Sequence, residues 1–179
     1  DTQPQTLWMS RAGVLDNFAT TSPMQDDDAL TLTILAGEVN AIAWLAEGSD
    51  LLIGTNGAMR TIGPADAGKN FGPQNFIQRR QSTFGSLDLQ PVQVAEVAIY
   101  PGYYGQTLRE FMFSFQTNGY ISPELTILSE HMFRFGIRSF TYAQDRDSII
   151  WCALGNGELV GVTYDRDQQI VACQRHRIG

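Results

Sequence analysis

The sequence lacks any apolar run approaching twenty residues, so it offers no segment able to cross a bilayer as a helix. It also lacks a recognisable signal peptide, because the opening stretch Asp1-Thr2-Gln3-Pro4-Gln5 is polar. The chain does not begin with Met. We therefore expect no association with a membrane, and we interpret the chain as a fragment or processed piece of a longer protein.

Lysine is nearly absent. Lys69 is the only lysine among twelve basic residues, and the formal net charge is −7. Tight nucleic-acid binding requires clustered positive charge, so the composition predicts none. Arginine in a chain so poor in lysine is typical of ion pairs and of subunit interfaces.

Cysteine is scarce as well, with Cys152 and Cys173 as the only two. Both lie in apolar segments that read as strands, and neighbouring strands could bring them together. Nothing else in the sequence suggests a disulfide-stabilised secreted scaffold. We expect two buried free thiols rather than a disulfide.

The motifs of common active sites are missing, since the sequence contains no H-E-x-x-H, C-x-x-C or G-x-S-x-G pattern and no phosphate-binding loop. Glu130-His131 together with His176 could form an acid/base couple or half a metal site, but a helical histidine packed at a junction of sheets is favoured. The sequence therefore predicts no catalytic residues, no cofactor-binding residues and no metal ligands, and the protein is not expected to be an enzyme.

Three polar or aromatic clusters remain to be weighed. Asp26-Asp27-Asp28 could hold Ca²⁺, yet the spacing matches no EF-hand, and a helix cap or solvated turn is favoured. Arg109-Glu110 is expected to form a buried ion pair at a sheet edge. Tyr103-Tyr104 lies between glycines and predicts an exposed aromatic tip, which could stack on a sugar or, as we favour, contact a neighbouring subunit.

A strand–turn–strand unit is what the sequence does contain, and it recurs about every fifty residues. The copies cover residues 149–164, 51–62 and 94–115, with turn tips near residues 57, 103 and 157. Asn56-Gly57 and Asn156-Gly157 are suited to type I′ hairpin turns. This period is typical of one propeller blade per unit, and blades must stack on neighbours to be stable.

The fold class predicted is mainly β, with stacked antiparallel blades that form part of a β-propeller-like domain and one or two short helices. We expect one domain over residues 1–179, with residues 137–179 as one complete four-stranded blade. Residues 29–37 could be strand or helix, and the Asp cluster with Gly37 slightly favours helix. Ser122-Pro123 predicts the start of a helix that ends at Gly136 and buries Leu125, Leu128 and Met132.

Two further expectations concern packing. Phe111, Phe113 and Phe115 alternate, which indicates one buried face of a strand. The apolar run around Trp151 indicates a strand buried on both faces, with Trp151 in the core. The units are too few to close a full propeller, so the first strands should pack against the last blade, or copies of the chain should associate.

The order of several motifs resembles tail proteins of short-tailed bacteriophages and related prophages, of the nozzle or hub type. The similarity covers nearly the whole chain and includes "SPMQDDDALTLTI", "LREFMFSF", "GYISPELTILSEHMF" and "IIWCALGNGELVGVTYDRDQQIVACQRHRI". Cys173 departs from the pattern, because the family usually has Trp there.

The resemblance implies a propeller-like β protein that forms a ring around a DNA exit channel. On that basis we expect a structural tail component that acts through contacts with other tail proteins and forms a homo-oligomeric ring in the full-length protein. It would reside in the virion tail, and in the host cytoplasm during assembly. The alternative is a receptor- or glycan-binding module of a phage tail; a glycan-cleaving enzyme is disfavoured because paired carboxylates are missing.

Overall fold

The computed structural model describes residues 3–34, 37, 39–145, 147–168 and 170–177. The fold is mainly β, and its strands form four antiparallel sheets. The only helix among these residues is a 3₁₀ turn, η1 (Glu130–Met132). The predicted mainly β class with stacked antiparallel sheets is confirmed. No helix in this part of the chain has the length and apolar character needed to cross a membrane.

Three of the sheets are four-stranded meanders, in which each strand pairs with the next along the chain. The first sheet is a two-stranded ribbon of β1 (Thr6–Met9) and β2 (Leu30–Thr33). The second sheet contains β3 (Ile42–Ala46), β4 (Leu51–Thr55), β5 (Met59–Gly63) and β6 (Ile77–Ser82). The third contains β7 (Val92–Val94), β8 (Val97–Pro101), β9 (Leu108–Ser114) and β10 (Gly119–Ile121). The fourth contains β11 (Ile137–Ala143), β12 (Ile149–Leu154), β13 (Leu159–Asp165) and β14 (Ile170–His176).

The three predicted hairpin tips lie at the central hairpins of the second, third and fourth sheets, but their turns are not type I′. Between β12 and β13 the Leu154 N–H donates to the Glu158 carbonyl, and the Gly157 N–H donates to the Leu154 carbonyl. Only Gly157 of this loop has a positive φ, +85°. This is the three-residue loop that ends in a left-handed glycine. At the Asn-Gly tip between β4 and β5, neither Asn56 nor Gly57 adopts a left-handed φ.

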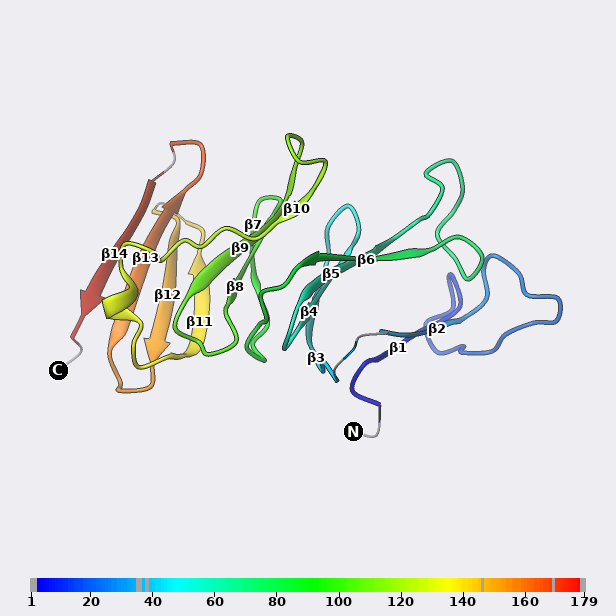
Figure 1. Ribbon diagram of the computed structural model, residues 1–179, viewed down its shortest axis with the longest axis horizontal. Helices are drawn as coiled ribbons and strands as arrows, with labels where there is room; N and C mark the ends of the chain where they lie inside the picture. The colour runs from blue at the N-terminus through cyan, green and yellow to red at the C-terminus, as the bar shows by residue number, and fades with distance from the viewer. Residues whose placement is uncertain (1–2, 35–36, 38, 146, 169, 178–179) are drawn as a thin grey trace.

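The sheets stack face to face in sequence order, as Figure 1 shows, and an apolar core fills each interface. The first and second sheets share a cluster of Leu7, Leu32, Ile34, Ile53 and Ile62. The second and third share one of Trp44, Leu52, Met59, Ala98, Tyr100, Phe111 and Tyr120. The third and fourth share the largest, which includes Val97, Ile99, Leu108, Phe133, Ile150, Cys152, Val160 and Val162. Alternate residues of β8 belong to the two cores on either side of the third sheet, as the period of two in a strand requires.

The stack does not close on itself. In Figure 1 the ribbon β1–β2 lies at one end of the row and the sheet β11–β14 at the other. The expectation that the first strands pack against the last blade is therefore wrong for the chain as described. The outermost faces of the two terminal sheets remain uncovered by other sheets of this chain.

The first predicted helix is a strand. Residues 30–33 form β2 in register with β1, where Leu32 pairs with Leu7 and Leu30 with Met9. Leu30 and Leu32 are buried while Thr31 and Thr33 are exposed, which is the alternation of a half-buried strand. Residues 35 and 36 of the predicted helix lie outside the described part. The alternation of Leu with Thr therefore indicated the correct structure, and the residues suited to cap a helix did not.

The second predicted helix, from Ser122 to Gly136, is also wrong apart from η1. The segment instead runs beside β9: the Leu125 N–H donates to the Leu108 carbonyl, and the Glu110 N–H donates to the Pro123 carbonyl. These bonds to β9 occupy backbone groups that a helix would need for itself. Of the three apolar residues predicted to be buried, Leu125 and Met132 pack against the core between the third and fourth sheets, whereas Leu128 is 91% exposed.

Of the three alternating phenylalanines, Phe111 alone is buried. Phe111 is fully buried, whereas Phe113 is 38% exposed and Phe115, beyond the end of β9, is 91% exposed. The three do not share a buried face. Phe113 and Phe115 instead contact each other at the exposed β9–β10 hairpin, with ring centroids 5.3 Å apart.

Candidate functional site

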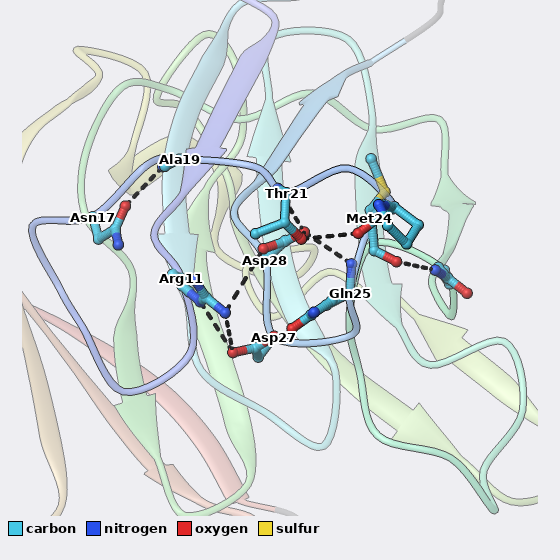
Figure 2. A network of polar contacts seen from close by, with 10 residues as sticks. Arg11, Asn17, Ala19, Thr21, Met24, Gln25, Asp27 and Asp28 are labelled. Carbon is cyan, nitrogen blue, oxygen red and sulfur yellow. Dashed lines mark hydrogen bonds and ion pairs between the residues drawn. The ribbon is translucent and has the colours of Figure 1, made fainter.

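The aspartate run organises a loop. Figure 2 shows Asp28 at the centre of a network that ties together residues 11–28. The Asp28 Oδ2 atom accepts hydrogen bonds from the Thr21 N–H, the Thr21 hydroxyl and the Gln25 N–H at 2.9, 2.6 and 2.8 Å. Donation from the Gln25 N–H, followed by that from Thr21, lowers the pKa of Asp28.

Arg11 completes this network. Its guanidinium donates twice to one oxygen of Asp27, at 3.0 and 2.7 Å, and lies 4.0 Å from the Asp28 Oδ1 atom. Asp28 precedes the strand β2, so it caps no helix. A positive charge beside the carboxylates is also the opposite of what a cation site requires. In the described ranges no three His, Cys, Asp or Glu side chains gather as metal ligands would.

The two histidines lie in different surroundings. Glu130 and His131 are exposed on η1, which lies near β14 through Ser129 and Cys173. His176 is on the opposite face of β14 from Cys173, and its ring lies 5.0 Å from that of Trp151. The fourth sheet separates these groups, so the structure does not bring them together as an acid/base couple.

Arg109 and Glu110 do not form the predicted ion pair, because successive residues of a strand point to opposite faces. The Arg109 guanidinium donates to Glu124 at 2.9 Å and lies 3.6 Å from the centre of the Phe84 ring. Glu110 points between the third and fourth sheets. Burial raises its pKa more than nearby Tyr164 and Arg166 lower it.

Tyr164 faces Glu110 across this interface. Its buried hydroxyl has no hydrogen-bond partner of standard geometry among the described residues, although it lies close enough to Glu110 for each group to shift the pKa of the other. Burial, followed by the charge of Glu110, raises the pKa of Tyr164. An acid and a phenol enclosed between two sheets have no access to substrate and act on the packing of the interface.

The cysteines are free thiols, as predicted, although only Cys152 is fully buried. They lie on β12 and β14 with β13 between them, opposite Val160 and Val162. Burial raises the pKa of Cys152 to about 12, so it remains an unreactive thiol at neutral pH.

The aromatic tip is where the sequence places it. Tyr103 and Tyr104, in the loop between β8 and β9, are 48% and 82% exposed, and their rings meet edge to face at 5.1 Å. Phe135 is 53% exposed. It lies near this tip, because the next residue, Gly136, lies against the Tyr104 carbonyl. This loop is an exposed aromatic contact point.

The largest candidate site is the outer face of the fourth sheet, the face turned away from the third sheet. Its residues are Ser139, Thr141, Ala143, Ile149, Trp151, Ala153, Leu159, Gly161, Thr163, Ile170, Ala172, Gln174 and His176, together with Asp165, which pairs with Ile170 at the end of β13. Among these residues Asp165 is the single Asp, Glu, Lys or Arg. A sheet face of this extent with so little charge is typical of a surface that another protein covers.

Trp151 is the centre of this outer face. It is half-buried and belongs to none of the three buried clusters, so the prediction that it is a core residue is wrong. Its ring lies over its cross-strand partner Gly161, where an added Cβ would come within 3.1 Å of the Trp151 Cζ3 atom.

The second sheet contains the same arrangement in a covered form. Trp44 pairs across the strands with Gly54, and its ring occupies the space of a side chain at Gly54. Here the third sheet covers the tryptophan, which is 3% exposed, donates to the Ser86 hydroxyl and lies 5.7 Å from the Tyr100 ring.

A shared sequence pattern underlies the two hairpins. Residues 44–54 and 151–161 both read W-x-A-x-G-x3-L-[IV]-G. In the second sheet Trp44 and Leu52 of this pattern face the third sheet; in the fourth sheet Trp151 and Leu159 face outward. The spacing of the hairpin tips did not reveal this pattern, because that spacing compares the central hairpins of the sheets. The shared pattern instead relates the first hairpin of the second sheet, β3–β4, to the central hairpin of the fourth sheet, β12–β13.

No family model matches the chain, and no curated protein matches it.

Proposed function

We propose that this protein is a structural component of a bacteriophage tail, or its prophage counterpart, that builds a tail wall through protein–protein contacts. The phage assignment rests on the motif order that resembles nozzle or hub proteins. The observation that supports a structural role is the outer face of the fourth sheet. That face repeats, without a cover, the tryptophan-on-glycine arrangement that the second sheet uses to receive its neighbour.

The proposed partner for this face is another sheet of the same kind. The three interfaces within the chain all join sheets face to face through apolar side chains. A second copy of the chain, or a further blade of a longer protein, would extend the row by the same contact. A contact between unlike faces of successive copies can close into a ring.

The net charge of −7 is consistent with a wall that does not hold passing DNA through its phosphates. The proposal includes residence in the virion tail, after assembly in the host cytoplasm. It also holds that the protein has no catalytic activity and binds no cofactor.

Association of the purified chain provides the first test. Light scattering and chemical crosslinking across a concentration series should show self-association that Trp151→Glu abolishes. Leu128→Glu is the matched control, because Leu128 is 91% exposed and lies outside this face. Equal association of the two variants would exclude the outer face as the interface.

Mass spectrometry of purified phage particles tests the assignment itself. The chain should be found at a fixed ratio to the other tail proteins. Its absence from intact particles would contradict a tail role, whatever the association experiment shows.

The exposed Tyr103-Tyr104 tip favours a second candidate, a glycan-binding module of a tail. Tyrosine rings exposed to this extent can stack on sugar rings. A glycan array with the parent and Tyr104→Ala separates the two roles: loss of a specific glycan signal in the variant supports this candidate, and no signal in the parent excludes it.

A further inference from the structure

Arg60 occupies an unusual position for a charged side chain. It lies on β5, on the face of the second sheet that packs against the first, next to its cross-strand partner Ile53 and to Ile62. It is only 8% exposed. Arginine shielded to this extent is normally paired with an acid.

The nearest charge to Arg60 has the same sign. Arg80 on β6 is its cross-strand partner, so both side chains project from the same face of the sheet. Neither guanidinium forms an ion pair or a hydrogen bond with any described residue. Burial, and then the charge of Arg80, lowers the pKa of Arg60.

Gln78 adds a third donor on this face. It pairs with Ile62, two residues along β6 from Arg80 and diagonal to Arg60. Its Nε2 atom and the Arg60 Nε atom are both buried, and neither has a hydrogen-bond partner among the described residues. Two shielded donors, neither bonded to an acceptor among the described residues, therefore lie on the same face as a second guanidinium.

We propose that Arg60, Gln78 and Arg80 form a binding site for a phosphate-type oxyanion, either the free ion or the terminal group of a phosphate monoester. Two guanidinium groups balance the two charges of such a group, and their forked donors match its oxygens. The shielding of Arg60 restricts the site to a small group, while exposed Arg80 lies at the entrance.

A simpler account is that arginine protects the exposed edge strand β6 from pairing with other chains. That account explains the exposed guanidinium groups of Arg79 and Arg80. It does not explain why Arg60 and Gln78 keep buried donors without acceptors. This inference is independent of the tail role proposed above.

Isothermal titration calorimetry of the full chain, at constant ionic strength, tests the site with inorganic phosphate, glycerol 3-phosphate and acetate. One phosphate per chain should bind, and acetate should bind more weakly because it balances only one charge. Binding of both phosphate compounds identifies the end of a larger ligand as the source; binding of inorganic phosphate alone identifies the free ion. Acetate binding as tight as phosphate, or no binding at all, would overturn the proposal.

Variants on the two faces of β6 provide the control. Arg80→Gln and Arg60→Gln should each weaken phosphate binding roughly tenfold or more, the loss expected for a charged hydrogen-bonding group. Arg79→Gln removes an equal charge from the opposite face and should bind as the parent does. Arg80 is exposed, so Arg80→Gln keeps the test valid if Arg60→Gln fails to fold. Equal weakening in Arg79→Gln and Arg80→Gln would show nonspecific attraction and contradict the site.

Discussion

Trp44 and Trp151 each pack on a glycine of the neighbouring strand. The stability cost of adding a side chain to that glycine depends on whether another sheet covers the tryptophan ring. We predict that Gly54→Ala destabilises the protein by about 1–3 kcal/mol, as overpacking of a core does. The new Cβ would lie 2.1 Å from the Cε2 atom of Trp44, whose ring the third sheet holds in place.

Gly161→Ala is the matched control, and should cost only about 0.5 kcal/mol, because no other sheet holds the side chains above Gly161 in place. Its Cβ would meet Trp151 at 3.1 Å, and the uncovered ring can tilt away. Urea unfolding midpoints measure both effects. Equal losses for the two variants would mean that the outer face of the fourth sheet is covered in solution.

Glu110 introduces a pH dependence at the interface of the third and fourth sheets. Its pKa is raised by burial, so its contribution to stability is fully present below the pKa of the unfolded chain and is lost as pH rises through the folded pKa. Glu110→Gln should therefore raise the thermal midpoint at pH 7, and the gain should shrink as pH falls towards 4. Glu96→Gln alters an exposed glutamate and should show neither effect. A variant less stable than the parent at pH 7 would contradict this prediction.

At the scale of elements, the loop of residues 11–28 depends on one carboxylate. Asp28→Ala removes the acceptor of the Thr21 and Gln25 amides, so hydrogen exchange at these two amides should accelerate. Asp26→Ala, at an exposed neighbour, should leave their protection unchanged.

The same loop should respond to acid. The pKa of Asp28 is lowered, so the stability it contributes is present above the pKa of the unfolded chain and is lost as pH falls through the folded pKa. Protection of the two amides should fall over that range in the parent and stay flat in Asp28→Ala. Unchanged protection in Asp28→Ala at neutral pH would show that other contacts hold the loop.

Hairpins were predictable from the sequence because their signals are local. Short apolar segments on either side of a glycine-containing turn predict β4–β5 and β12–β13 without knowledge of what packs on them. The structure of the segment after Ser122 was not predictable in this way. Its sequence contains local signals for the start of a helix, but its structure is decided by hydrogen bonds to Leu108 and Glu110 on β9. Tertiary contacts overrode propensity there.

The candidate site was harder to predict than the fold. An apolar strand such as β12 has two faces, and the sequence does not state which face another sheet will cover. Trp151 looks like a core residue in sequence, and its counterpart Trp44 is one. Only the order of stacking shows that Trp151 faces outward. The unpaired donors of Arg60 and Gln78 likewise became visible only once register placed them on one face of the second sheet.

At the scale of the whole molecule, an open row of sheets distributes stability by position. The second and third sheets each have a core on both faces, whereas the first and fourth sheets each have one. Contacts are made between neighbours in the row, so stability should follow the nearest-neighbour behaviour of a repeat protein. Native-state hydrogen exchange should therefore show the strongest protection in the central strands of these two sheets, β4, β5, β8 and β9.

Shortening one buried side chain near each end of the row tests this in a paired experiment. Ile150→Ala empties a fully buried position in the core of the third and fourth sheets, at a cost of about 2–5 kcal/mol. Its loss of protection should concentrate in β11–β14 and leave β1–β2 unchanged. Ile62→Ala, in the core of the first and second sheets, should produce the reverse pattern. If each variant lowers protection uniformly from β1 to β14, the chain unfolds as one cooperative unit, and its sheets cannot be treated as separable blades that a longer row could extend.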